Sequence, residues 1–210
     1  MRTEPVFNPL DKKNLGSSVA EALVLRERSP LPPRERFIAA GVYAIYYQGD
    51  HPLYTAIATK NRANNGDDLP IYVGKAIPKG ARKGGTTLDR GVGTVLFDRL
   101  KQHSETIQAA QDLKLSDFFC RYLAVDDIWI PLGENLLIEE FSPLWNKVVE
   151  GFGNHDPGSG RERSKMSPWD IIHPGRSWAL KLQPGKDRKL IEQKIRYFLA
   201  KQFGKSAESS

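Results

Sequence analysis

The stretch Gly41-Val42-Tyr43-Ala44-Ile45-Tyr46-Tyr47 and its partner Pro70-Ile71-Tyr72-Val73-Gly74-Lys75 decide the fold of this chain of 210 residues. Both segments are rich in β-branched and aromatic residues and are flanked by glycine, proline and polar turn formers, so each predicts a buried β-strand. Between them, residues 53–64 leave room for one or two helical turns before the turn signal Asn64-Asn65-Gly66-Asp67. We therefore expect the two strands to pair antiparallel in one small sheet.

The other apolar segments predict a third strand and four further helices. Residues 117–125 have strand composition. Helices are predicted from a cap at Ser17-Ser18 to about residue 25, over about 94–111, from Pro131 to Phe141, and over about 187–203. The predicted fold class is α+β, with a small three-stranded, mostly antiparallel sheet flanked by helices. We expect a single domain over 1–210, with a core at 41–146, an N-terminal arm at 1–40, a C-terminal loop and helix at 147–203 and a disordered tail at 204–210.

Composition indicates a basic protein outside the membrane. The formal net charge is +6 and the isoelectric point is about 9.4, which suits an anionic partner such as nucleic acid without requiring one. No apolar run suggests a membrane span, and the N-terminus lacks the pattern of a secretory signal. The single cysteine, Cys120, excludes an internal disulfide framework. We expect a cytoplasmic protein.

The two tyrosine segments resemble those of a nuclease superfamily. Gly41-Val42-Tyr43 and Tyr72-Val73-Gly74 are conservative variants of the Gly-Ile-Tyr and Tyr-Ile-Gly segments that name the GIY-YIG nucleases, and Arg99, Glu134 and Asn146 follow in that family's order. Valine for isoleucine preserves shape, whereas the basic loop at 77–93 is longer than the family core needs. A narrower likeness, carried by residues 31–37, 143–146 and 151–161, points to the type II restriction endonucleases of this family that cut a GC-rich palindrome.

This resemblance implies a magnesium-dependent nuclease that cuts double-stranded DNA, with CCGCGG as a guess at the site and Mn²⁺ expected to substitute for Mg²⁺. Cutting both strands of a palindrome is most simply done by a two-fold dimer, so we expect a homodimer formed through the N-terminal arm or the last helix. A cognate DNA methyltransferase is the expected genetic partner. Two alternatives stay open: another GIY-YIG nuclease, structure-selective or from a mobile element, and a non-catalytic DNA-binding protein on the same fold.

Six residues are the candidate catalytic set. Glu134 is the predicted metal ligand, because Mg²⁺ prefers carboxylate oxygen and often takes only one or two protein ligands; the alternative is a charge complementing the helix dipole. Arg99 and His103 are four residues apart on a predicted helix, so they can share one face and serve as phosphate clamp and proton carrier, or simply be solvated. The resemblance adds Tyr43 and Tyr72, as base or water-orienting groups that could equally be core tyrosines, and Asn146, as a ligand of phosphate or metal-bound water.

The predicted DNA contacts lie in two loops. Reading guanine in the major groove needs donors aimed at O6 and N7, for which arginine is the usual residue. The loop of the 150s is the expected recognition loop, and the Gly-rich basic stretch after residue 74 is expected to follow the backbone. Any of these residues could contact phosphate only. The predicted DNA-binding residues are Lys75, Arg82, Lys83, Asn154, His155, Arg161 and Arg163.

Overall fold

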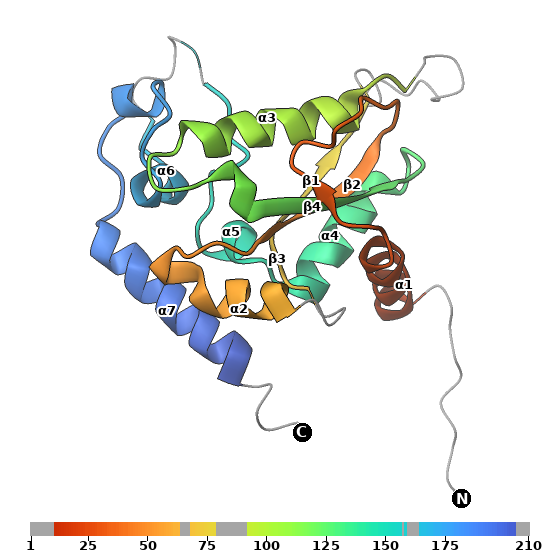
Figure 1. Cartoon of the computed structure of the whole chain (residues 1–210), viewed down its shortest axis with the longest axis horizontal. Helices are drawn as coiled ribbons and strands as arrows, with labels where there is room; N and C mark the ends of the chain where they lie inside the picture. Colours follow the sequence, from red (N-terminus) through yellow and green to blue (C-terminus); the bar gives the residue numbers. More distant parts are fainter. Residues whose placement is uncertain (1–10, 64–67, 79–91, 157, 159–163, 205–210) are drawn as a thin grey trace, which may run out of the picture.

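The computed structural model describes residues 11–63, 68–78, 92–156, 158 and 164–204, and its centre is an antiparallel sheet. The strands are β1 (Ser29–Pro30), β2 (Gly41–Tyr47), β3 (Pro70–Ala76) and β4 (Phe118–Ala124), in the order β1-β4-β2-β3. Helices flank the sheet, which confirms the predicted α+β class (Figure 1). The three predicted strands are present, and the expected number is corrected to four because the two-residue β1 pairs with the edge of β4. A strand that short leaves no periodic signal in the sequence.

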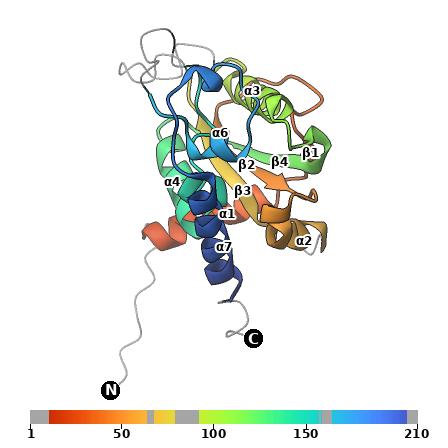
Figure 2. The same ribbon diagram turned by 90° about the vertical axis from the view of Figure 1, so that its left-hand side faces the viewer.

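The two faces of β2 belong to different layers of the core. Tyr43, Ile45 and Tyr47 pack into one cluster, while Val42, Ala44 and Tyr46 face another, as the alternation of a β-strand requires. The first face is covered by α2 (Thr55–Ala63), α3 (Val95–Ala109), α5 (Leu144–Lys147), α6 (Pro168–Ile172) and α7 (Arg188–Gly204). The second is covered by α1 (Lys12–Val24) and α4 (Ile130–Phe141), and Figure 2 shows the sheet between α4 on one side and α2 on the other.

The helices at 94–111, 131–141 and 187–203 are confirmed to within a few residues by α3, α4 and α7. The N-terminal helix begins earlier than expected, at Lys12, so Ser17 and Ser18 lie exposed inside α1 rather than at its cap. The extra turn brings the buried Gly16 against Leu136 of α4, which a helix beginning at residue 17 would forgo. Gly204 ends α7 instead of opening a tail, and 205–210 lie outside the described residues.

A one-turn 3₁₀ helix, η1 (Pro52–Tyr54), precedes α2, and two others, η4 (Leu115–Asp117) and η6 (Ala179–Lys181), lie before β4 and after α6. Most of the predicted basic loop, at 79–91, lies outside the described residues. Among the described helices, none is long and apolar enough to cross a bilayer.

Candidate active site

The glycine of the second tyrosine segment makes room for the tyrosine of the first. The register of β2 and β3 pairs Tyr43 with Gly74. A Cβ atom on residue 74 would lie 2.3 Å from the Tyr43 hydroxyl oxygen and 2.5 Å from its Cζ, closer than atoms can approach. Only glycine at this position therefore lets the Tyr43 ring lie across β3, which explains physically why the two segments occur together.

The Tyr43 hydroxyl lies 2.6 Å from Nε2 of His103 on α3, and both side chains are buried. Burial raises the pKa of Tyr43 well above its usual value, and nearby Tyr72 adds to the rise. Burial also lowers the pKa of His103 far below its usual value, and the positive charge of Arg99 lowers it further. Both groups are therefore neutral, and we assign the hydrogen bond as the phenol donating to the imidazole.

Arg99, one turn before His103 on α3, joins this pair to the loop of the 150s. Its Nη2 donates to the carbonyl oxygen of Gly153 at 3.0 Å, and its Nη1 lies 2.5 Å from Nε2 of His155. Burial and the Arg99 charge lower the pKa of His155, so this imidazole can accept the hydrogen bond as a neutral ring. The Arg99 charge also opposes the rise in the pKa of Tyr43. The guanidinium is thus held at the site by the loop predicted to read DNA.

Tyr72 completes one wall of the site from β3. Its ring contacts those of Tyr43, His103 and Phe152 at centroid distances of 6.3, 5.2 and 4.9 Å. Its hydroxyl approaches the loop so closely that a Cβ atom at Gly153 would lie 2.7 Å from it. Burial raises the pKa of Tyr72, and Arg99 opposes the rise. The predicted residues Tyr43, Tyr72, Arg99 and His103 therefore meet in one place.

Glu134 on α4 forms an ion pair with Lys75 of β3, a residue predicted to bind DNA. The two side chains are 17% and 34% exposed. The Glu134 carboxylate contributes to raising the pKa of both Tyr43 and Tyr72, which places its charge within electrostatic range of them. A half-buried single carboxylate fits Mg²⁺, an ion that takes few protein ligands and completes its shell with water and phosphate.

Asn146 of α5 binds the backbone of β3. Its Oδ1 accepts a hydrogen bond from the N–H of Val73, and its Nδ2 donates to the Val73 carbonyl, both at 2.8 Å. β3 is an edge strand, so these backbone groups have no neighbouring strand and the amide takes that place. In this structure Asn146 fixes β3 beside the site, and its predicted contact with phosphate or water stays a prediction.

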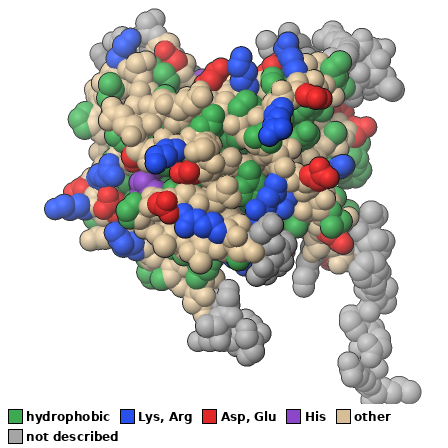
Figure 3. Space-filling view, viewed as in Figure 1, with side chains coloured by type: hydrophobic (Ala, Val, Ile, Leu, Met, Phe, Trp, Pro, Cys, Tyr) green, Lys and Arg blue, Asp and Glu red, His purple; other side chains and the backbone are tan. Residues whose placement is uncertain are grey.

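The predicted recognition residues Asn154 and His155 are exposed and line a cleft of about 320 Å³ together with Arg99 and His103. Arg82, Lys83, Arg161 and Arg163 lie outside the described residues. On the face drawn in Figure 3, the described Lys and Arg side chains are spread among Asp and Glu rather than gathered in one patch.

Arg176, which sequence analysis missed, holds the loop of the 150s in place. Its guanidinium donates to the carbonyls of Gly151, Phe152 and Asn154 at 2.9, 3.3 and 3.0 Å and to the Asp170 carboxylate at 2.6 Å. It also lies 4.7 and 4.5 Å from the ring centres of Trp169 and Trp178. Since backbone carbonyls are the main acceptors, no residue pattern could have indicated this role.

The core of a GIY-YIG nuclease combines two tyrosine strands packed through a glycine, an Arg–His pair on the following helix, and a carboxylate further along the chain. Tyr43 against Gly74, Arg99 with His103, and Glu134 match this description. The family model described as the Eco29kI GIY-YIG domain matches residues 35–199, and the chain belongs to this family of restriction endonucleases. No curated protein matches the chain. Family membership makes the protein a nuclease acting on DNA.

Proposed function

We propose that this protein is a type II restriction endonuclease that hydrolyses phosphodiester bonds of double-stranded DNA in a Mg²⁺-dependent reaction. The proposed recognition sequence in the DNA is a GC-rich palindrome, with CCGCGG as the working guess from the family likeness. The observation that carries the proposal is the hydrogen bond of the buried Tyr43 hydroxyl to a neutral His103 beside Arg99. It joins a buried proton donor to a proton acceptor, His103, which lines one cleft together with the phosphate-binding cation Arg99.

The proton path starts at the attacking water. A neutral His103 can take the Tyr43 proton through Nε2, so that the Tyr43 oxygen takes a proton from the water as it attacks phosphorus. Burial alone keeps the phenol protonated, so this path needs the positive charge of Arg99, whose effect on the pKa of Tyr43 has the required sign. Tyr72 lies beside the same hydroxyl and can orient the water.

Arg99 and Glu134 would share the charge of the phosphate. The guanidinium can turn from His155 toward a nonbridging oxygen, because bidentate contact with phosphate is its strongest interaction. Glu134 would hold Mg²⁺, or Mn²⁺ in its place, which supplies charge stabilisation for the transition state and the departing 3′ oxygen. Lys75 then leaves the carboxylate and is free to meet the DNA backbone.

The same proposal includes the partners. A palindrome calls for two copies of the chain, and α7 offers a contact surface because Leu190 and Tyr197 are 55% and 73% exposed on it. A cytoplasmic location and a cognate methyltransferase that protects host DNA follow from the restriction function. Asn154 and His155, with Arg161 and Arg163, are the proposed readers of bases.

The deciding experiment is digestion of unmethylated plasmid DNA with Mg²⁺, followed by sequencing of the fragment ends. Wild-type protein should give discrete fragments that share one palindrome. Glu134→Ala should give none, while Glu139→Ala, an exposed glutamate on the same helix, should cut normally. Tight DNA binding without cleavage by the wild type would reject the proposal in favour of a non-catalytic binder.

A further inference from the structure

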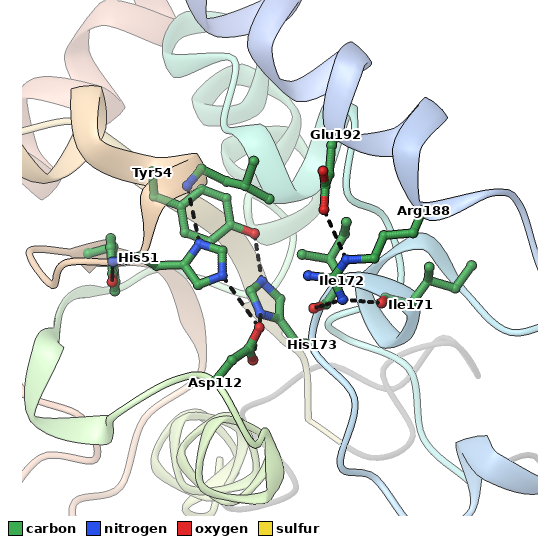
Figure 4. A network of polar contacts seen from close by, with 10 residues as sticks. His51, Tyr54, Asp112, Ile171, Ile172, His173, Arg188 and Glu192 are labelled. Carbon is green, nitrogen blue, oxygen red and sulfur yellow. Dashed lines mark hydrogen bonds and ion pairs between the residues drawn. The ribbon is translucent and has the colours of Figure 1, made fainter.

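Two histidines and one carboxylate from three distant segments meet in a second cluster that shares no residue with the site around Tyr43. His51 caps η1, Asp112 follows α3, and His173 ends α6. Figure 4 shows both imidazole rings directed at the Asp112 carboxylate. His173 Nδ1 lies 3.0 and 3.1 Å from its two oxygens, and His51 Nε2 lies 3.4 Å from one of them.

The other nitrogen of each ring has a partner outside this triangle. His173 Nε2 lies 2.6 Å from the Tyr54 hydroxyl, and His51 Nδ1 accepts a hydrogen bond from the N–H of Leu53 at 3.3 Å. The backbone just before His173 is also held in place, because Arg188 of α7 donates to the carbonyl oxygens of Ile171 and Ile172 at 3.2 Å. One nitrogen of each ring is thus oriented by its surroundings while the other converges on Asp112. Of the two outer partners, only the Tyr54 hydroxyl at His173 can accept a proton, as the outer partners of histidine ligands in metalloproteins do.

We propose that His51, Asp112 and His173 bind a transition-metal ion of the Zn²⁺ class. Zinc bonds of about 2.0–2.2 Å in a tetrahedron place neighbouring ligand atoms roughly 3.3–3.5 Å apart. The two separations that include the carboxylate are 3.0–3.4 Å, and the ligand atoms of all three residues lie within 4.8 Å of one another. The third edge, between the two ring nitrogens, is at most 4.8 Å and would shorten to the tetrahedral value when the metal binds.

Binding requires no net change of protonation in either ring. Each neutral imidazole gives its lone pair to the metal and carries its proton on the opposite nitrogen. For His173 that proton lies on Nε2, where the Tyr54 oxygen can accept it. For His51 it lies on Nδ1, so the long contact from Leu53 is given up. Three metal–ligand bonds form. They replace the hydrogen bonds of His51 and His173 to Asp112 and the hydrogen bond from the Leu53 N–H to His51.

The donor set selects the metal. Two imidazoles and one carboxylate suit Zn²⁺, Co²⁺ or Ni²⁺, whereas Mg²⁺ prefers oxygen ligands and belongs with Glu134. The Asp112 side chain is 29% exposed, so the ion can enter from solvent and a water molecule can complete its shell. His173, in contrast, is fully buried.

The proposed ion has a structural role. Its ligands come from the core at His51 and Asp112 and from the C-terminal extension at His173, so the metal fastens α6 to the core. α6 contains Asp170, the partner of Arg176, which in turn holds the recognition loop. Zn²⁺ should therefore stabilise the fold without taking part in hydrolysis.

The test is titration of Zn²⁺ into chelator-treated Glu134→Ala protein, a background that removes the proposed catalytic ligand. Calorimetry should find one ion per chain, and Co²⁺ should give the visible absorption bands of a tetrahedral site. Asp112→Asn in this background should bind at least about 100-fold more weakly, since even partners behind the ligands contribute roughly 10- to 100-fold. Glu105→Gln, an exposed carboxylate on α3, should bind like the parent.

A second measurement separates loss of metal from loss of fold. Saturating Zn²⁺ should raise the melting temperature of the parent and of Glu105→Gln but not that of Asp112→Asn or His51→Gln. No Zn²⁺ binding by a folded parent would show that the cluster is a hydrogen-bonded clamp and overturn the proposal. Equal binding by the parent and Asp112→Asn would place the ion elsewhere and overturn it as well.

Discussion

Replacing Arg176 should destabilise the protein more than replacing an arginine at the surface. The residue is 5% exposed, and its partner Asp170 is 3% exposed. Arg176→Ala removes hydrogen bonds to three carbonyls and leaves the Asp170 carboxylate buried without its cation, although Ser167 still donates to it at 2.6 Å. Breaking one partner from a buried ion pair costs about 3–5 kcal/mol, a large part of the stability of most domains.

The assay is urea unfolding monitored by tryptophan fluorescence, since Trp169 and Trp178 flank the Arg176 guanidinium. Arg176→Lys, which keeps the charge but cannot reach four acceptors, provides a milder variant in case the alanine protein fails to fold. Arg196→Ala on the exposed side of α7 is the matched control and should change stability by no more than about 0.5 kcal/mol.

A double-mutant cycle with Asp170→Asn tests the cause. If the unpaired Asp170 charge accounts for most of the lost stability, Asp170→Asn should lower the free energy of unfolding less in the Arg176→Ala protein than in the wild type. The coupling free energy should be roughly 0.5–3 kcal/mol. Strict additivity, or a loss below about 1 kcal/mol for Arg176→Ala, would refute the reasoning.

Three further outcomes follow from the site. Gly74→Ala should destabilise by about 1–3 kcal/mol in urea unfolding and slow cleavage, because the new Cβ meets the Tyr43 ring; unchanged cleavage would contradict the register. The pKa of His103 in the folded state is depressed below its unfolded value of about 6.5. The contribution of the neutral ring to stability is therefore full above that pH and is lost as pH falls toward the folded-state pKa, by up to about 1.4 kcal/mol per pH unit. The stability of His103→Asn should thus fall less between pH 7.5 and 5.5 in urea titrations, and parallel curves would count against the assignment. Asn146→Ala should lose about 1–3 kcal/mol by unpairing the edge of β3, and no loss would mean that water replaces the amide.

Local pattern was enough to predict three of the four strands and the shared helix face of Arg99 and His103, whereas the family resemblance brought Tyr43 and Tyr72 to the same site. Tyr43 and Tyr72 lie on strands whose composition and flanking turns are local properties, and Arg99 and His103 share a helix face through their spacing. The alternation along β2 then fixes which face each tyrosine occupies. These features depend on nearest neighbours in the chain, which is why a sequence can predict them.

Contacts between distant segments were not predictable in the same way. His51, Asp112 and His173 converge only after α3 and α6 have packed, and Arg176 mostly binds carbonyl oxygens, which every residue possesses. β1 escaped notice because two residues carry no period. The partner of Asn146 is likewise backbone, so its amide could be assigned to phosphate from the sequence while the structure gives it to Val73.

The loop of the 150s, proposed to read DNA, is joined to the proposed catalytic residues through backbone and ring contacts. Arg176 fixes its carbonyls, Gly153 accepts a hydrogen bond from Arg99, and the Phe152 ring stacks on His103 at 4.5 Å. If this loop moves when it contacts bases, it must also move the groups that hold Arg99 and His103, the proposed catalytic arginine and histidine. Coupling of this kind gives a restriction enzyme a physical means of cutting only after the correct sequence is bound, because misplacing the catalytic groups by about 1 Å can slow the reaction by roughly 100-fold.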